Sequence, residues 1–156
     1  MDHVVYLDNK SQELAKLLVG SKTMIVRGSM GKKAPYGRVF AQDTLYFITC
    51  GSGQVVARGS VRSVLQTPQL CPEETQQILL DHQRQLMLSP VQFQRWANKA
   101  YLVLVEVEDV NMVSPFALDR TGFNPLDDWL MVGEIESATA ERVMNESLWM
   151  DEALVG

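Results

Sequence analysis

The alternation of apolar and polar residues predicts several short β-strands in this chain. Runs rich in β-branched and aromatic side chains occupy residues 3–7, 22–27, 44–50, 54–66, 101–110 and 129–135. The tripeptide 51–53, Gly-Ser-Gly, joins two of these runs, and so short a connection predicts an antiparallel hairpin. Within the run 54–66, Arg58 and Arg62 are expected on one face of the strand, and Gly59 permits sharp coiling there.

Four other stretches show the spacing of amphipathic helices. The first is expected to begin at an N-cap, Asp8, and to stop at Gly20. The second begins with Pro72 and two acidic residues and is expected to run to residue 87. The third follows Ser89, which starts a capping box with proline at the first helical position. The fourth, an acidic stretch, begins at Ser137.

Short strands with helices inserted between them predict an α+β fold. The hairpin and the glycines favour a small, partly closed, mostly antiparallel β-barrel with flanking helices over a parallel sheet. We expect one such domain over residues 1–136. Residues 137–156 are then a C-terminal amphipathic helix or tail, packed on the body or on a partner.

The composition, 46% hydrophobic and 21% charged, is typical of one globular domain. No apolar run is long enough to span a membrane, and the first residues lack the basic-then-apolar order of a secretion signal. Cys50 and Cys71 are far apart and form no CxxC pair, which argues against a disulfide framework or a zinc site. We therefore expect a cytoplasmic protein that does not contact a membrane.

Candidates for metal binding and cysteine catalysis are weak. Asp127-Asp128 are neighbours that would point apart on a strand, and Glu73-Glu74 in a first helical turn mainly complement the helix dipole. A catalytic pair of Cys50 with a histidine is disfavoured, because a cysteine at a hairpin end is more often a small apolar filler. Trp96 and Trp129 are expected in the core. We therefore expect neither a metal nor a cofactor.

The charge is distributed unevenly along the chain. The whole chain has a net charge of −5, yet residues 20–62 hold seven basic side chains against one acidic, a net charge of +6. Residues 63–156 hold five basic and fifteen acidic side chains, a net charge of −10. Cations at this density repel one another unless an anion or distant acidic groups offset them, and phosphate is an obvious anion.

The strongest local pattern is the segment 20–27, Gly-Ser-Lys-Thr-Met-Ile-Val-Arg, in which a predicted helix ends and a strand leaves with a cation at each end. With its variable loop and the following strand at 43–47, it resembles the ASCH family of PUA-like domains. The order of elements agrees over residues 8–135. The resemblance implies a PUA-like barrel with a cleft beside this strand, RNA binding and, in some members, hydrolysis of a modified nucleoside or cleavage of RNA.

One position departs from the family pattern. Ile25 stands where similar proteins often carry a polar residue, commonly Glu, and where those resembling N4-acetylcytidine amidohydrolases carry a catalytic Thr. An isoleucine can neither transfer a proton nor act as a nucleophile. The resemblance therefore supports binding more strongly than catalysis, and whether the chain is an enzyme stays open.

The leading hypothesis is a domain that binds RNA or a nucleotide in a basic cleft. The expected contact residues are Lys22, Thr23, Arg27, Lys33, Tyr36, Arg38 and Arg58. Arginine offers a planar fork for bidentate phosphate contacts, and a tyrosine ring offers a stacking face for a base. The plain alternative is that these are ordinary surface cations at strand ends.

Two other function classes stay open. One is a small hydrolase of the amidohydrolase or ribonuclease type, acting on a modified nucleoside or RNA, with Lys22 as an acid-base group or charge stabiliser. The other is a protein-interaction module, in which the acidic remainder of the chain or the helix expected from Ser137 docks a partner protein, or that helix docks a second copy of the chain.

Overall fold

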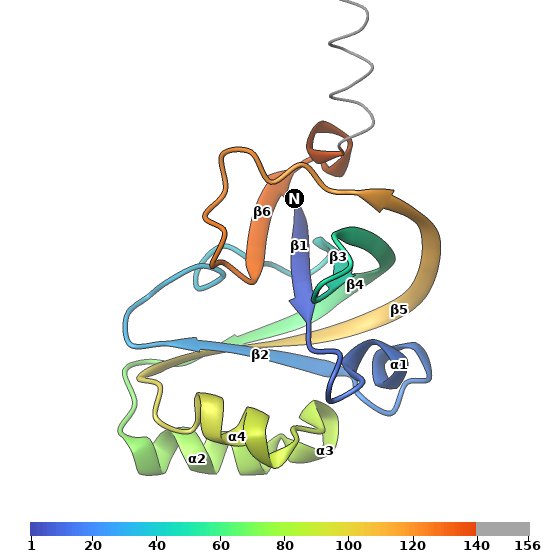
Figure 1. Ribbon diagram of the computed structural model, residues 1–156. Helices are drawn as coiled ribbons and strands as arrows, with labels where there is room; N and C mark the ends of the chain where they lie inside the picture. The colour runs from blue at the N-terminus through green and yellow to red at the C-terminus, as the bar shows by residue number, and fades with distance from the viewer. Residues whose placement is uncertain (140–156) are drawn as a thin grey trace, which may run out of the picture.

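The computed structural model describes residues 1–139 of the chain. Six strands form one mixed sheet in the spatial order β2-β5-β4-β3-β1-β6 (Figure 1). The strands are β1 Asp2–Leu7, β2 Met24–Ser29, β3 Thr44–Thr49, β4 Gln54–Gln66, β5 Tyr101–Ala117 and β6 Trp129–Gly133. The helices are α1 Glu13–Leu18, α2 Pro72–Asp81, α3 Gln83–Leu86, α4 Pro90–Trp96 and the 3₁₀ helix η1 Ile135–Ala138.

The sheet curls into a half-barrel, with the long strand β5 bending around one side of it (Figure 1). β1 pairs with β3 in parallel, and the other strand pairs are antiparallel. Register shifts interrupt the β4–β5 pairing, and such bulges bend strands. A side chain at Gly59 would place its Cβ 3.0 Å from Val110 Cγ2, so the strands approach closely only because this residue is glycine. The predicted α+β, partly closed and mostly antiparallel architecture is confirmed.

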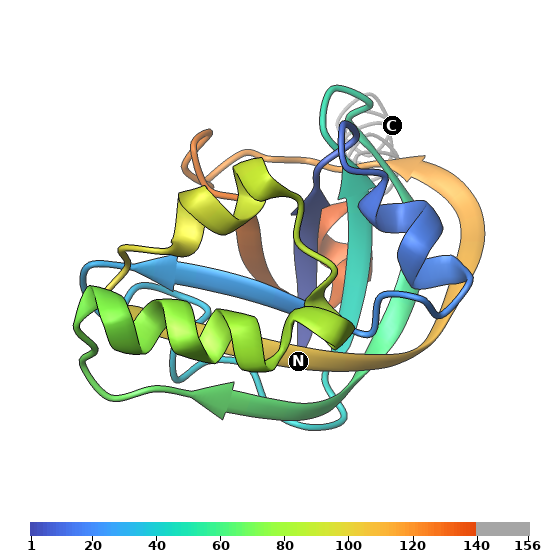
Figure 2. The same ribbon diagram turned by 90° about the horizontal axis from the view of Figure 1, so that it is seen from below.

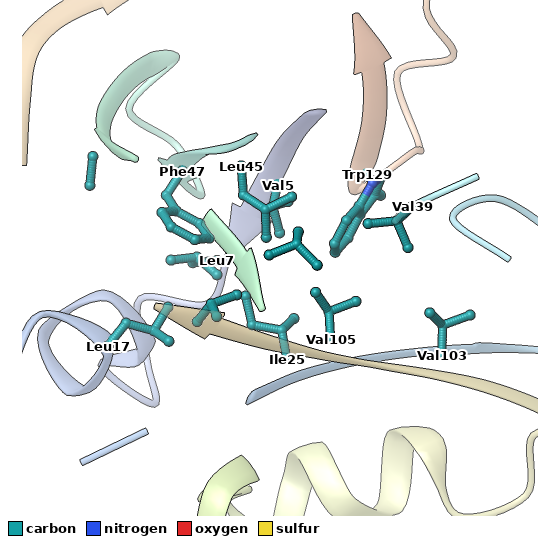
Figure 3. Packing of buried hydrophobic residues seen from close by; sticks show 13 residues of the cluster. Val5, Leu7, Leu17, Ile25, Val39, Leu45, Phe47, Val103, Val105 and Trp129 are labelled. Atoms are coloured by element: carbon teal, nitrogen blue, oxygen red, sulfur yellow. The ribbon is translucent and has the colours of Figure 1, made fainter. Parts of the chain in front are cut away.

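Alternation along β2 supplies two separate cores. Ile25 points into the curled sheet and packs in a cluster with Leu17, Val105 and other apolar residues (Figure 3). Met24 and Val26 belong to a second cluster on the outer face, which α2, α3 and α4 cover (Figure 2). Because both faces are buried at the start of this strand, its first three residues form a continuous apolar run instead of an alternating one.

The first helix begins later than the sequence predicted. Asp8 is not its N-cap, because the Asp8 carboxylate accepts hydrogen bonds from the Lys10 backbone N and from Ser11 Oγ, both at 2.9 Å. These two bonds stabilise a turn, and the helix starts only at Glu13. An aspartate can satisfy a turn as readily as a helix end, which the apolar spacing alone does not reveal.

The helix predicted over residues 72–87 is two helices, because the chain leaves helical geometry at His82, where φ is −108°. The predicted strand that begins at Tyr101 extends to Ala117 instead of residue 110, because β4 pairs with it as far as Gln54. The loop between β5 and β6 covers residues 118–128. The capping box that begins at Ser89 is confirmed at the start of α4.

The predicted C-terminal helix falls largely outside the described residues. Residues 137 and 138 belong to η1, Thr139 forms an isolated bridge with Leu118, and residues 140–156 are not described. Within residues 1–139, none of the helices has the length and apolar character needed to cross a membrane.

Candidate functional site in a cationic cleft

Arg27 bridges the two ends of the curled sheet. Its Nη2 donates to the backbone oxygen of Tyr6 in β1, and its Nη1 donates to the backbone oxygen of Val26, both at 2.8 Å. Its Nε lies 3.2 Å from Oδ2 of Asp128, which immediately precedes β6. Arg27 is only 9% exposed. A guanidinium carries five N–H donors in one plane, and this geometry allows one side chain to reach all three positions.

Two tryptophan rings lie beside this guanidinium. Cζ of Arg27 is 5.9 Å from the centroid of Trp96 and 5.8 Å from the centroid of Trp129. Arg95 lies 5.6 Å from the Trp96 ring. Both tryptophans are buried, as the sequence predicted, but Trp96 also lines the cavities described next. The electron-rich faces of these rings favour a cation that has little contact with water.

Two cavities adjoin at Arg27 and together form the cleft. The larger chamber has a volume of about 420 Å³ and the smaller chamber about 190 Å³. The residues that line both are Arg27, Arg95, Trp96, Leu126 and Asp128. They come from β2, α4 and the loop 118–128, so the cleft lies where edge strand β2 faces the chain entering β6.

Lys22 lies in the wall of the larger chamber and is only 2% exposed. Its Nζ donates to the backbone oxygen of Leu86, and its backbone N donates to the Lys16 oxygen at 3.1 Å. Burial lowers the pKa of Lys22 to about 8, with the carboxylate of Glu13 opposing that shift and the charges of Arg27 and Lys16 adding to it. An ammonium has three donors, so Lys22 retains donors for a ligand in this chamber.

A buried carboxylate and amide also line the larger chamber. Nε2 of Gln92 donates to Oε1 of Glu13 at 2.6 Å, and both residues are less than 8% exposed. The capping box of α4 orients Gln92, because the Gln92 Oε1 accepts from the Ser89 backbone N at 3.0 Å. The sequence predicted this capping box. It did not predict that Gln92 also holds Glu13, because Glu13 lies on a different helix.

The smaller chamber is bordered by Lys33 and two tyrosines. Nζ of Lys33 lies 3.1 Å from Oδ1 of Asp127. The hydroxyl of Tyr36 donates to the backbone oxygen of Thr67 at 2.6 Å, and its ring meets Tyr101 edge to face with centroids 5.7 Å apart. The Tyr36 ring is therefore held in a fixed position with part of its surface facing the chamber.

The cleft brings together four of the seven contact residues that the sequence predicted. Lys22 lines the larger chamber, Lys33 and Tyr36 line the smaller one, and Arg27 lines both. The other three, Thr23, Arg38 and Arg58, line neither chamber. Sequence reasoning missed Glu13, Gln92, Arg95 and Asp128 as members of the same cleft.

Thr23, Arg38 and Arg58 have surroundings of their own. The backbone of Thr23 accepts from Val107 N at 2.9 Å and donates to Gln85 oxygen at 3.0 Å, next to a different surface hollow. Arg38 is exposed on the loop before β3, and Arg58 is exposed on β4. Within residues 1–139, no group of three or more metal-ligating side chains is gathered at one place.

Solved structures share this arrangement of strands and helices. The crystal structure of ASCH from Zymomonas mobilis matches 92% of this chain and 94% of its own, with a TM-score of 0.62 and 14% identity. A mutant of the same protein matches 92% of this chain and 96% of its own, with a TM-score of 0.63 and 14% identity. The chain has an ASCH-like fold. No protein-family model and no curated protein matches the sequence.

The ASCH-like fold confirms the resemblance at the level of architecture, and the structure locates the position that departs from the family pattern. Ile25 is 1% exposed and packs inside the curled sheet, on the opposite side of β2 from Val26, which lines the larger chamber. The residue at position 25 is therefore part of the core. Groups in the cleft capable of acid-base chemistry include Lys22, Glu13 and Asp128.

Proposed function

We propose that this chain binds RNA or a nucleotide in the cationic cleft. The observation that carries the proposal is the convergence of two buried cations, Lys22 and Arg27, on one cavity that Trp96 also lines. Burial of a cation costs free energy unless an anion or a hydrogen-bond network compensates it. A phosphate compensates that charge, and the aromatic faces of Trp96 and Tyr36 suit bases.

The composition of the cleft supports a ligand with both charged and planar parts. Arg95 and Lys33 add two cations at the rim, and both are exposed enough to meet a ligand before it enters. Glu13 and Gln92 add acceptor and donor groups inside the larger chamber, of the type that hydrogen-bonds to base edges. A phosphate at Arg27 would lie between the two chambers, with room for a base on either side. Thr23, Arg38 and Arg58 line neither chamber and stay predictions from the sequence alone, outside the cleft proposal. A cytoplasmic location stays a prediction.

The test is RNA binding by exposed variants, because these leave the core intact. We expect single-stranded RNA to bind, its affinity to fall as salt rises, and Lys33→Ala and Arg95→Ala each to weaken binding by about fivefold and flatten the salt dependence. Arg84→Ala is the matched control, since Arg84 is exposed on α3 and lines neither chamber. Fluorescence anisotropy measures all four proteins. Affinity that is independent of salt, or equal in the variants and the control, contradicts the proposal.

The second candidate function is hydrolysis of a modified nucleoside or of RNA. The observation that favours it is Lys22, whose pKa burial lowers to about 8, next to the buried carboxylate of Glu13 in one chamber. Incubation of wild type, Lys22→Met and Glu13→Gln with acylated nucleosides and short RNAs tests this candidate. Turnover by wild type that both substitutions abolish supports it, and no turnover by wild type rejects it. The interaction-module alternative rests on the acidic remainder of the chain or on the tail helix, most of which is outside the described residues, and it stays a prediction.

A further inference from the structure

Two cations of the cleft already have carboxylate partners, and these partners are consecutive residues. Lys33 Nζ lies 3.1 Å from Asp127 Oδ1, and Arg27 Nε lies 3.2 Å from Asp128 Oδ2. Both aspartates lie at the end of the loop 118–128, directly before β6. The acidic pair, Asp127 and Asp128, therefore neutralises the charges that an incoming phosphate would need.

The contact between Arg27 Nε and Asp128 is an ion pair without a well-directed hydrogen bond. Although Nε of Arg27 is buried and within ion-pair distance of Asp128, it makes no hydrogen bond of acceptable geometry within the described residues. A buried donor that lacks a hydrogen bond is costly, so an acceptor placed in better line with Nε would be bound preferentially. A phosphate oxygen is such an acceptor.

The backbone of the loop is held while its acidic side chains remain reachable from solvent. Arg120 donates to the backbone oxygen of Asn124 at 2.6 Å and lies 4.9 Å from the Tyr6 ring, and Tyr6 N donates to the Asp128 oxygen at 2.9 Å. The side chains of Asp127 and Asp128 are 30% and 48% exposed. Either carboxylate can therefore rotate into water without moving the chain.

We propose that Asp127 and Asp128 occupy the cleft cations in the free protein and that phosphate groups of a ligand displace them. This inference rests on the proposed function and narrows the ligand class. Because the two carboxylates hold cations of adjoining chambers, full exchange requires two anionic groups, as in an oligonucleotide or a nucleoside diphosphate. A neutral nucleoside has no group that competes with either carboxylate. The acidic pair then sets how strongly charged a ligand must be to enter.

The test compares substitutions that remove one charge and keep the shape. We expect Asp127→Asn and Asp128→Asn each to bind single-stranded RNA and inorganic pyrophosphate about threefold more tightly than wild type, and the double variant about tenfold. Removal of any negative charge raises anion affinity slightly through long-range attraction. Glu108→Gln is the control for that effect, because Glu108 is exposed on β5 and lines neither chamber. Calorimetry measures binding of both probes.

The two probes separate this inference from the proposed function. Tighter pyrophosphate binding by the aspartate variants, with no RNA binding by any protein, supports the acidic pair and rejects RNA as the ligand. RNA binding by wild type, with aspartate variants no tighter than Glu108→Gln, supports the proposed function and overturns the acidic pair. Weaker binding of both probes by the aspartate variants also overturns it, since the carboxylates would then assist the ligand.

Discussion

The cleft and the outer face of β4 both carry cations, but in opposite surroundings. In the cleft, Lys22 and Arg27 are 2% and 9% exposed and are held by backbone oxygens. On β4, Arg58 and Arg62 are exposed, and Arg62 Nη1 lies 3.7 Å from Oε1 of Glu106. The charges on β4 are screened by water and salt, whereas the buried charges in the cleft interact strongly with any anion that reaches them. Charge density alone therefore does not define a binding site.

The largest difference between the two regions is expected in stability. Arg27→Met removes the guanidinium that joins β2 to β1 and leaves the buried oxygens of Val26 and Tyr6 without their donors, so we expect a loss of about 3 kcal/mol. Arg58→Met on β4 is the matched variant and is expected to change stability by less than about 0.5 kcal/mol. Urea unfolding measures both. A small loss for Arg27→Met would mean that the two regions do not differ in this way.

The pH dependence of binding sharpens the same comparison. Because burial lowers the pKa of Lys22 to about 8, its ammonium loses charge in the folded protein as the pH rises above that value, while exposed cations keep theirs. We expect RNA affinity to fall about tenfold between pH 7 and pH 9.5 in wild type, and Lys22→Met to bind weakly at both pH values. A fall of equal size in Lys22→Met would place the titrating group elsewhere.

The sign of the stability change is opposite to that of binding. In the unfolded chain Lys22 has its ordinary pKa of about 10.5, and in the folded protein the pKa is about 8. Between these values the unfolded state binds more protons, so the Lys22 contribution to the free energy of unfolding rises with pH across this window. Urea unfolding at pH 7.5 and pH 9.5 is expected to show this rise in wild type and not in Lys22→Met.

Smaller changes in stability and RNA affinity are expected from the N-cap of α4, the helix that carries Gln92 into the larger chamber. Ser89→Ala removes the Oγ that accepts from the Gln92 backbone N at 3.2 Å, and loss of such an N-cap costs about 1 kcal/mol. RNA affinity is expected to fall only slightly, because the Ser89 backbone N still donates to Gln92 Oε1 and Gln92 Nε2 still donates to Glu13. The control on β4 is Ser63→Ala. The Ser63 Oγ donates to half-buried Glu106 at 2.9 Å at the surface, and its loss is expected to change neither stability nor RNA affinity.

Local patterns predicted the parts of the fold that depend on neighbouring residues. The capping box at Ser89 and the hairpin at 51–53 were predicted because each is determined within a few residues of the chain. The motif at 20–27 likewise predicted that Lys22 and Arg27 lie at the cleft. The ASCH-like fold agrees with the family resemblance of this motif. These signals are short in sequence and do not require knowledge of the tertiary fold.

The rest of the cleft was not predictable, because it depends on contacts between distant segments. Glu13 and Gln92 are 79 residues apart in the chain, and only the tertiary fold brings their side chains into hydrogen-bond contact. The sequence argues against Asp127 and Asp128 as a metal site, because neighbouring residues on a strand point apart. Nothing local indicates that the two aspartates reach two different cations. The sequence predicted the exposed face of β4 that carries Arg58, but it could not show that this face lies outside both chambers of the cleft.

The smallest change in RNA affinity is expected from removing the arginines of β4. This change decides whether RNA binds at the cleft or at any positive surface. Arg58→Ala combined with Arg62→Ala removes two positive charges, as many as Lys33→Ala combined with Arg95→Ala removes from the cleft rim. If RNA binds only by general attraction to a positive surface, both double variants must weaken binding equally, because long-range attraction depends on net charge. If the cleft makes direct phosphate contacts, the β4 double variant weakens binding less than about twofold at 0.15 M salt, where charges beyond about 8 Å are screened. Anisotropy titrations of both double variants at that salt concentration distinguish the two cases, and equal losses would remove the cleft as the site of binding.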